Sequence, residues 1–213
     1  IGQGQAFLAI AGENHDGHGF LAQAARAGSP LAIINDAAVP GLAMPRGMAV
    51  LAVHDTRRAL LRLAAAYRKT LDGTRVVAVT GSNGKTTTVR LIEAVLSGSM
   101  RGTASVKSFN NSIGVPLTIL RARPGDKYLI CEVGTNAPGE VAELAGVVQP
   151  DVGVVVSVGR EHLERLSSLR EVCREETSQL QHLRPGGLAV VNADAPYMDE
   201  MTRAFAAGGN GGG

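Results

Sequence analysis

A glycine-rich segment that follows an apolar run is the first part of this sequence with the residues to do chemistry. Residues 75–80 read RVVAVT, and 81–88 read GSNGKTTT. The two glycines of this segment allow positive φ and let main-chain amides approach an anion, while a following helix adds its dipole. A lysine supplies positive charge and a threonine hydroxyl can reach Mg²⁺. We therefore predict a phosphate-binding loop for a nucleoside triphosphate, made by Gly81, Ser82, Asn83, Gly84, Lys85, Thr86 and Thr87.

The loop departs from the common form of this motif. That form has another glycine five residues before the second one, where this sequence has Val79. The segment is therefore a shortened variant. The alternative is an ordinary strand-to-helix turn, which the combination of glycines, lysine and three threonines between a strand and a helix disfavours.

Polar residues that end or follow the other predicted strands extend this site. In an open parallel sheet the ligand lies beyond the carboxyl ends of the strands. Glu132 ends one strand, His162 follows the next, and Asn192 and Asp194 follow a further one. The Glu132 carboxylate, the His162 imidazole and the Thr86 hydroxyl around a triphosphate would form a cage for a divalent cation, and hard oxygen ligands suit Mg²⁺. Two alternatives stay open: Glu132 as a solvated strand end, and His162 as a capping or packed histidine.

Glu176 is a candidate metal ligand because of its place on a predicted helix. The apolar residues of the helix at 169–183 define an inward stripe, and Glu176 falls on that stripe whereas Glu175 points off it. An inward carboxylate needs a metal, a cation or a proton beside it, since burying it alone costs several kcal/mol. The alternative is a glutamate at the rim of the stripe that reaches solvent.

The elements that position these residues predict an α/β protein of two parts. In the first part we expect short strands at 6–10, 31–34 and 49–53 and helices at 20–27 and 56–71. Along the second helix, Leu60, Leu63, Ala64 and Tyr67 form an apolar side, with Arg57, Arg58, Arg62 and Arg68 opposite. Asp72, Gly73 and Thr74 break this pattern, so we place a domain boundary there.

Strands and helices then alternate regularly. Unbroken Val, Ile, Leu and Ala strands separated by helices indicate a parallel sheet covered on both faces. We expect strands at 75–80, 128–133, 152–158 and 188–192, and helices at 86–96, 139–148, 169–183 and 196–205. The fold class is thus α/β, with a mostly parallel phosphate-loop domain after a small, N-terminally incomplete α/β domain.

Composition excludes several classes of protein. The chain has 213 residues, 45% of them hydrophobic and 19% charged, with a net charge of +2. Seven aromatic residues and no basic cluster beside them argue against nucleic-acid binding. No apolar run approaches the ~18 residues of a membrane helix, so we expect no membrane insertion and a cytoplasmic protein. Two cysteines without metal-type spacing indicate buried free thiols. The first residue, Ile1, and a glycine-rich end suggest a fragment.

Along nearly its whole length the sequence resembles the Mur ligases. The resemblance rests on GENHDGHGFLAQAARAG (12–28), VVAVTGSNGKTTT (76–88), SFNNSIGVPLTIL (108–120), EVGTNAPGEVAELA (132–145), VGREHLE (158–164) and VVNADAPYM (190–198). It implies ATP and Mg²⁺ as cofactors, and UDP-N-acetylmuramoyl-tripeptide and D-alanyl-D-alanine as substrates, joined through an acyl phosphate in peptidoglycan precursor synthesis. It also implies a UDP-substrate domain at 1–73, an ATP-binding domain at 74–213, incomplete here, and an absent last domain. We expect a monomer, inactive as an isolated fragment.

The resemblance also implies roles for individual residues. Lys85, Glu132 and His162 would be catalytic, with Lys85 on the terminal phosphates. Thr86 and Glu132 would hold one Mg²⁺ and His162 a second. The peptide side of the cleft would be lined by Asn110, Asn111, Thr135 and Asn136, although such asparagine pairs also build turns.

One position departs from the family pattern. Glu176 stands where the family usually has a carbamylated lysine, so it would supply a carboxylate on a shorter arm. This departure leaves two alternatives open. One is a sister ligase of another acid and amine, such as a folate polyglutamylating or cyanophycin-type enzyme, and the other is a non-catalytic nucleotide-binding module.

Overall fold

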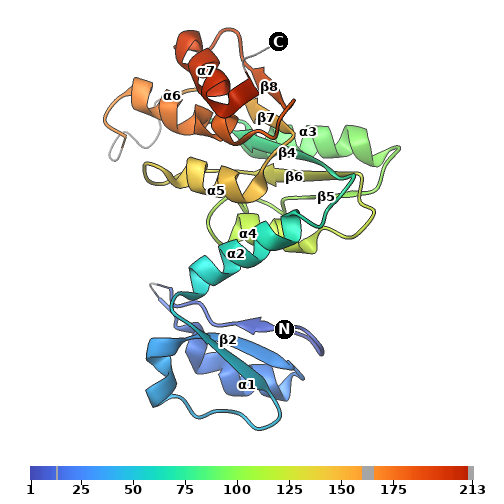
Figure 1. Ribbon diagram of the computed structural model, residues 1–213, viewed down its shortest axis with the longest axis vertical. Helices are drawn as coiled ribbons and strands as arrows, with labels where there is room; N and C mark the ends of the chain where they lie inside the picture. Colours follow the sequence, from blue (N-terminus) through green and yellow to red (C-terminus); the bar gives the residue numbers. More distant parts are fainter. Residues whose placement is uncertain (13, 160–165, 211–213) are drawn as a thin grey trace. The chain divides into compact units, whose positions relative to one another are not determined.

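A computed structural model of the chain describes residues 1–12, 14–159 and 166–210 (Figure 1). The chain divides into two compact units, Ile1–Arg62 and Leu63–Gly213, and the division falls within one helix. Both units contain parallel β-sheet, which confirms the predicted α/β class. Over the described residues, none of the helices combines the length and apolar character needed to cross a bilayer.

The first unit is built on a three-stranded parallel sheet in the order β1-β2-β3. Its strands are β1 Phe7–Leu8, β2 Leu31–Asn35 and β3 Ala49–Val53, and its helix α1 covers Leu21–Arg26. Apolar side chains of these elements and of residues next to them make a small core of Ala9, Leu21, Ala32, Ile34 and Met48. The first strand is shorter than predicted, because only two of its residues pair with β2.

Helix α2, Thr56–Arg68, differs from its predicted pattern. Leu60 and Ala64 are buried as expected, but Leu63 is 48% exposed, and Arg68, which was expected on the polar side, is 3% exposed. The Arg68 guanidinium donates to the carbonyl oxygens of Val148 and Gln149 at 2.8 and 2.9 Å. The prediction for Arg68 was wrong because acceptors about 80 residues away satisfy its donors inside the protein.

The second unit is built on a five-stranded parallel sheet in the order β5-β6-β4-β7-β8. The strands are β4 Arg75–Thr80, β5 Gly102–Ala104, β6 Tyr128–Glu132, β7 Val152–Val155 and β8 Leu188–Val191. The central strand β4 is buried after its first residue, and Val77, Val79 and Ile130 belong to the core. The chain moves to opposite sides of β4 through β6 and β7, which makes its carboxyl end the switch point where ligands bind in such sheets.

Helices connect these strands as the alternation predicted. They are α3 Lys85–Ser97, α4 Gly114–Arg121, α5 Glu140–Val148, α6 Leu169–Thr177 and α7 Met198–Phe205, with a 3-10 helix at Ser178–His182 that continues α6. Strand β5 and helix α4 were missed. Helix α4 escapes a propensity argument because Gly114 and Pro116 lie in its first turn, where proline loses no hydrogen bond. The Asn111 side chain accepts from the amides of Ile113 and Gly114 and so caps it.

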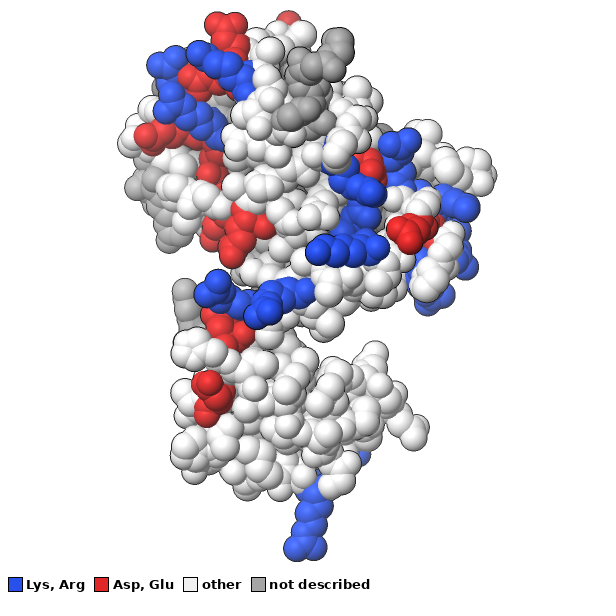
Figure 2. Space-filling model, in the orientation of Figure 1, with Lys and Arg blue, Asp and Glu red and all other residues white. Residues whose placement is uncertain are grey.

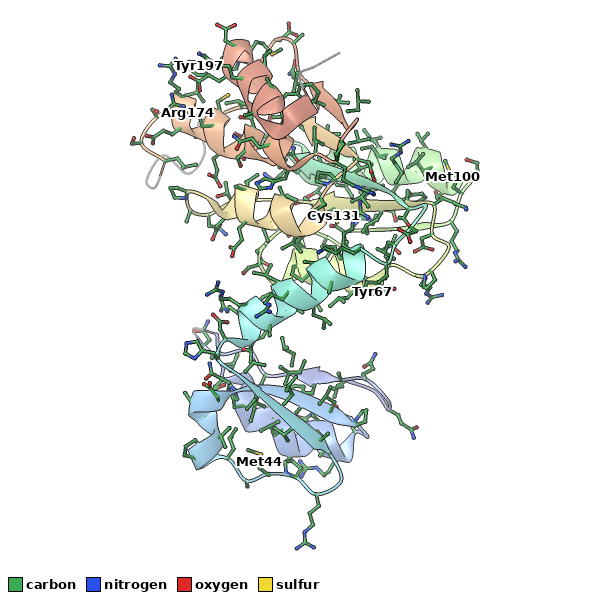
Figure 3. The ribbon with its side chains drawn as sticks, viewed as in Figure 1. Met44, Tyr67, Met100, Cys131, Arg174 and Tyr197 are labelled. Carbon is green, nitrogen blue, oxygen red and sulfur yellow. The ribbon has the colours of Figure 1, made fainter. Side chains whose placement is uncertain are left out.

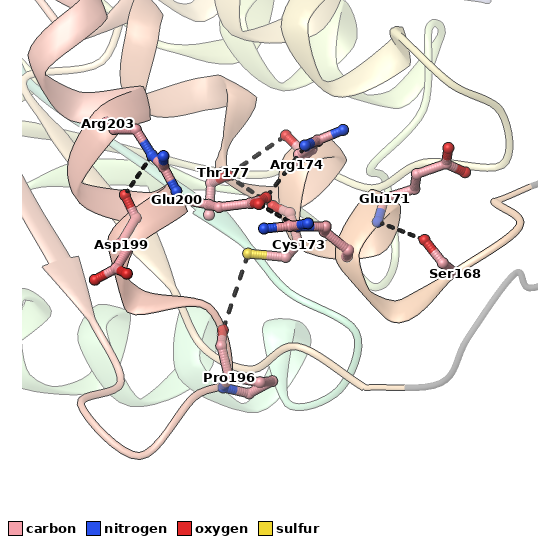
Figure 4. A network of polar contacts seen from close by, with 10 residues as sticks. Ser168, Glu171, Cys173, Arg174, Thr177, Pro196, Asp199, Glu200 and Arg203 are labelled. Carbon is pink, nitrogen blue, oxygen red and sulfur yellow. Dashed lines mark hydrogen bonds and ion pairs between the residues drawn. The ribbon is translucent and has the colours of Figure 1, made fainter.

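Helices α6 and α7 are held together by charge (Figure 4). Arg170 and Arg174 both pair with the buried Glu200 of α7, the latter at 3.2 Å. The Ser168 hydroxyl accepts from the amide of Glu171 at 3.2 Å and so caps the start of α6. On the face of the larger unit seen in Figure 2, basic and acidic side chains lie interspersed. These contacts fix α6, the helix that carries Glu176.

The two cysteines are free and buried, as predicted. Cys131 lies on β6, within the sheet, and Cys173 lies on α6 (Figures 3 and 4). Burial raises the pKa of Cys131 to about 12 and that of Cys173 to about 11.

Candidate functional site

The glycine-rich loop forms the turn between β4 and α3, and both of its glycines are required there. Gly81 has φ 130° and Gly84 has φ 85°, backbone conformations that residues other than glycine rarely adopt. A Cβ on Gly81 would also stand 2.8 Å from the backbone nitrogen of Ser157. The path of the loop is therefore determined by its two glycines and by the close approach of Ser157, which follows β7.

The first three amides of the loop already have acceptors within the protein. The Gly81 amide donates to Oε2 of Glu176 at 2.7 Å, and the Ser82 amide donates to the Ser157 carbonyl at 3.0 Å. The Asn83 amide donates to the Ser157 hydroxyl at 2.9 Å, and this hydroxyl donates back to the Asn83 carbonyl at 2.9 Å. These three amides therefore shape the turn. Only the amides that follow them are left to bind an anion.

The next amides belong to the start of α3 and face no acceptor among the described residues. They are those of Gly84, Lys85, Thr86 and Thr87, and the first helical bond runs from Thr88 to the Gly84 carbonyl. Lys85 Nζ lies over the loop and donates to the carbonyls of Gly81 and Ser82 at 2.5 and 3.2 Å. A helix start with unsatisfied amides and a nearby ammonium group is the arrangement that binds phosphate.

A buried carboxylate lies beside the start of α3. Glu132 at the end of β6 is 1% exposed, so the alternative that this residue is a solvated strand end is wrong. Its Oε2 accepts from the Thr86 hydroxyl at 2.8 Å and its Oε1 from the Asn110 amide group at 2.9 Å. Its own amide donates to the Ser105 hydroxyl. The sheet thus brings Thr86, Glu132 and Asn110 together, although they are far apart in sequence.

The other predicted substrate residues make local contacts. Asn111 caps α4. The Thr135 hydroxyl donates to the Ala137 carbonyl at 2.7 Å and accepts from the Ala137 amide at 3.1 Å, and the Asn136 amide donates to Glu140 at 2.6 Å. These contacts build the turn before α5.

Glu176 faces inward, but its neighbour does so too. Glu176 is 2% exposed, so the reading of a rim residue is wrong. Glu175 was expected to point away, yet it is 7% exposed and its two oxygens accept from the amides of Gly139 and Val141 at 2.8 and 2.9 Å. That expectation failed because α6 packs against both β4 and the start of α5, which lacks a side-chain cap of its own. His162 lies outside the described residues.

Ser157 is the residue of the site that the sequence analysis missed. Besides holding the loop, it follows β7 at the sheet edge where Glu132 ends β6. Its signal was a single hydroxyl in the otherwise apolar run at 152–158.

Two oxygen atoms of this site, from Thr86 and Glu132, suit a magnesium ion that is bound together with a nucleotide. Among the described residues no three His, Cys, Asp or Glu side chains lie close enough together to hold a metal ion. Mg²⁺ bound to nucleotides needs fewer protein ligands, because phosphate and water oxygens complete its shell. The adjacent oxygens of Thr86 and Glu132, 2.8 Å apart beside the phosphate loop, therefore fit such an ion.

Comparison with known proteins identifies the class to which this fold and site belong. The Mur ligase middle domain family matches residues 79–210, and the chain belongs to this family. UDP-N-acetylmuramoyl-tripeptide–D-alanyl-D-alanine ligases are similar in sequence. The one from Bacillus subtilis (strain 168) is 38% identical over 92% of this chain and 42% of its own, and the one from Escherichia coli (strain K12) is 35% identical over 90% and 41%.

Solved structures of similar proteins agree. MurF from Acinetobacter baumannii superimposes with a TM-score of 0.87 at 33% identity, over 96% of this chain and 44% of its own. The MurF ligase from Thermotoga maritima, solved in complex with ADP, gives a TM-score of 0.84 at 29% identity, over 96% and 46%. The chain therefore spans less than half the length of these relatives.

Proposed function

We propose that this chain carries the nucleotide-binding and phosphoryl-transfer part of an ATP-dependent ligase that joins D-alanyl-D-alanine to a UDP-N-acetylmuramoyl-tripeptide. The observation that carries the proposal is the start of α3, where four successive amides and Lys85 converge beside the Thr86–Glu132 pair. The relatives that match over most of this chain bear the name of that ligase. ADP in the similar Thermotoga maritima structure supports a nucleotide at the loop.

The chemistry explains why a phosphate loop serves amide formation. A carboxylate is a poor electrophile and its oxygen a poor leaving group, and transfer of the terminal phosphoryl group from ATP to that oxygen removes both faults. The amine of the dipeptide then attacks the acyl phosphate, and phosphate leaves as the amide forms. The protein contributes mainly positioning and neutralisation of charge. We assign the phosphates to the amides of Gly84–Thr87 and the terminal phosphate to Lys85, with Gly81, Ser82 and Asn83 shaping the turn.

We further propose that Thr86 and Glu132 hold a magnesium ion against the phosphates. When bound, Mg²⁺ would neutralise charge on the phosphate oxygens. Asn110 holds the second oxygen of Glu132, so we assign it to orienting this carboxylate as well as to the peptide side of the cleft. Contacts of Asn111, Thr135 and Asn136 with substrate, of His162 with a second ion and of Glu176 with that ion stay predictions.

The remaining assignments concern the whole protein. We propose that residues 1–73 belong to a domain for the UDP end of the substrate and 74–213 to the ATP-binding domain. We also propose a monomeric enzyme, and one that is cytoplasmic because its substrates are water-soluble nucleotide and peptide precursors.

The test uses the full-length gene product. Phosphate release from Mg·ATP is measured with UDP-N-acetylmuramoyl-tripeptide and either D-alanyl-D-alanine or glutamate, and the amide product is identified by mass spectrometry. Release that depends on D-alanyl-D-alanine supports the proposal. Release with glutamate instead favours a sister ligase, and nucleotide binding without any amide favours a non-catalytic module.

A matched pair of variants tests the site within that assay. Glu132→Gln keeps a hydrogen-bond acceptor but removes the charge, so we expect a higher Mg²⁺ requirement and a loss of rate of about 10²-fold. Glu143→Gln, an exposed change on α5, is the control and should behave as wild type. An unchanged Mg²⁺ requirement in Glu132→Gln would remove this residue from the metal site.

A further inference from the structure

Helix α6 is attached to the end of β4 by a buried chain of hydrogen bonds. The Thr80 hydroxyl donates to the main-chain carbonyl of Glu176 at 2.8 Å. The side-chain amide of Gln179 donates to that same hydroxyl at 2.7 Å and to the Val154 carbonyl at 2.9 Å. Thr80, Glu176 and Gln179 are each at most 2% exposed. The backbone of Glu176 is therefore fixed relative to the strand that leads into the phosphate loop.

From this fixed backbone the side chain of Glu176 reaches the first amide of the loop. Its Oε2 accepts from the Gly81 amide at 2.7 Å. A hydrogen bond in a buried place is stronger than one exposed to water, because the local dielectric constant is low. Its geometry also complements that of Ser157, which accepts from the next two amides. Together the two residues determine the direction in which the chain leaves β4.

We propose that Glu176 is a positioning residue for the phosphate loop. Its carboxylate holds Gly81 so that the following turn delivers Lys85 and the amides of Gly84–Thr87 to a nucleotide phosphate. This role rests on the proposed nucleotide binding, and it goes beyond the predicted metal contact because it needs no ion. A negative charge near a phosphate is unfavourable in itself, and the hydrogen bond that orders the loop offsets this cost.

Two substitutions distinguish the positioning role of Glu176 from the predicted role as a metal ligand. Glu176→Gln keeps an oxygen that can accept from Gly81 but removes the charge, whereas Glu176→Ala removes both. If Glu176 positions the loop, the glutamine variant should bind ADP within about threefold of wild type, and the alanine variant about tenfold more weakly, with EDTA or with Mg²⁺ alike. Glu171→Gln, an exposed change on the same helix, is the matched control and should leave ADP affinity unchanged.

Isothermal titration of ADP against this chain, with EDTA and with Mg²⁺, measures these affinities. A loss in Glu176→Gln that appears only with Mg²⁺ would overturn the proposal in favour of a metal ligand. Tighter ADP binding in both variants would overturn it as well, because charge repulsion would then outweigh the positioning effect.

Hydrogen exchange gives a readout that does not depend on nucleotide. Glu176→Ala should raise the exchange rates of the Gly81, Ser82 and Asn83 amides at least about tenfold, while amides within β4 and β6 keep wild-type rates. Unchanged exchange at Gly81 would overturn the proposal even if ADP affinity falls. If wild type binds no ADP but the alanine variant loosens the loop, the proposed function fails while the structural role of Glu176 stands.

Discussion

In the five-stranded sheet, charged side chains at the amino ends of the strands are paired with opposite charges, whereas the described ones at the carboxyl ends, Glu132 and Lys85, are held by neutral groups. At the amino edge, Arg68 lies 3.4 Å from Asp151, and Asp151 also accepts from the Val76 amide at 2.8 Å. Asp126, 2% exposed, is paired with Arg101 at 3.0 Å and accepts from the Thr103 hydroxyl at 2.9 Å.

At the carboxyl edge, the Glu132 carboxylate accepts from a hydroxyl and a side-chain amide, and Lys85 donates to main-chain carbonyls. In the described part of the chain neither residue has an ion pair. Among the described residues, the charges of Glu132 and Lys85 are thus balanced locally by dipoles.

This difference fits the proposal that the charged residues at the amino edge stabilise the fold and those at the carboxyl edge bind a ligand. A charged group already paired with its opposite gains little from a further ion, whereas a carboxylate and an ammonium held by neutral partners can both exchange them for a metal and a phosphate. The comparison predicts that substitutions at the amino edge lower stability, while substitutions at the carboxyl edge lower activity and leave stability nearly unchanged.

Arg68→Ala should give the largest effect on stability. Removing the guanidinium leaves the carbonyls of Val148 and Gln149 without this donor and takes the nearer countercharge from Asp151, and breaking such a pair typically costs about 3–5 kcal/mol. Urea unfolding of the chain measures the free energy of unfolding. The exposed Arg62→Ala on the same helix is the control and should change it by less than about 0.5 kcal/mol. A loss below about 1 kcal/mol in Arg68→Ala would break the comparison at this edge.

Lys85→Ala tests the opposite edge. Without the ammonium group the terminal phosphate loses its neutralising charge, and phosphoryl transfer by the full-length protein should fall about 10²–10³-fold. The melting temperature should stay within about 2 °C of wild type, since Lys85 is half-buried and, among the described residues, donates only to two carbonyls of its own loop.

Lys127→Ala, an exposed lysine at the amino edge, is the control for Lys85→Ala and should retain wild-type rates. A Lys85→Ala protein with normal turnover would remove the phosphate-loop assignment.

Sequence periodicity could predict the sheet and the edge at which the site forms. Unbroken apolar strands between helices indicated parallel pairing, and the residues that follow each strand pointed to Glu132 and the loop. Local pattern also placed Glu176 inward.

The contacts of individual charged residues could not be predicted in the same way. Arg68 and Glu175 find their partners in segments tens of residues away, and nothing in their own helices indicates these partners. Helical periodicity places Arg68 four residues after the buried Ala64, so the pattern allowed burial, but its charge argued for solvent. Tertiary hydrogen bonds decided between these two possibilities.

Acid titration sharpens the comparison through Asp126. Burial raises the pKa of this carboxyl, but the Arg123 amide, the Thr103 hydroxyl and the Arg101 guanidinium outweigh burial and hold its pKa below the ordinary 3.8. A lowered folded-state pKa contributes stability above the unfolded pKa and loses it as the pH falls through the folded value. We therefore expect the free energy of unfolding to decrease between about pH 5 and pH 2.

The Asp126→Asn variant tests this assignment, since it cannot titrate. It should be less stable than wild type at pH 7, and its stability should fall less steeply with acid. Equal slopes in urea unfolding at successive pH values would show that Asp126 does not contribute to the acid response.

Thiol labelling probes the smallest expected difference, which is the difference in local opening between the middle of the sheet and helix α6. Both cysteines are buried with raised pKa values, about 12 for Cys131 and about 11 for Cys173, so iodoacetamide at pH 8 should modify the native protein far more slowly than the protein in urea. Cys173 should react first, as seen by peptide mapping. Its helix can open locally, whereas Cys131 lies on β6 between β4 and β5 and becomes accessible only when the whole sheet unfolds. Labelling of Cys131 before Cys173 would show instead that the sheet opens more readily than the helix that holds the phosphate loop.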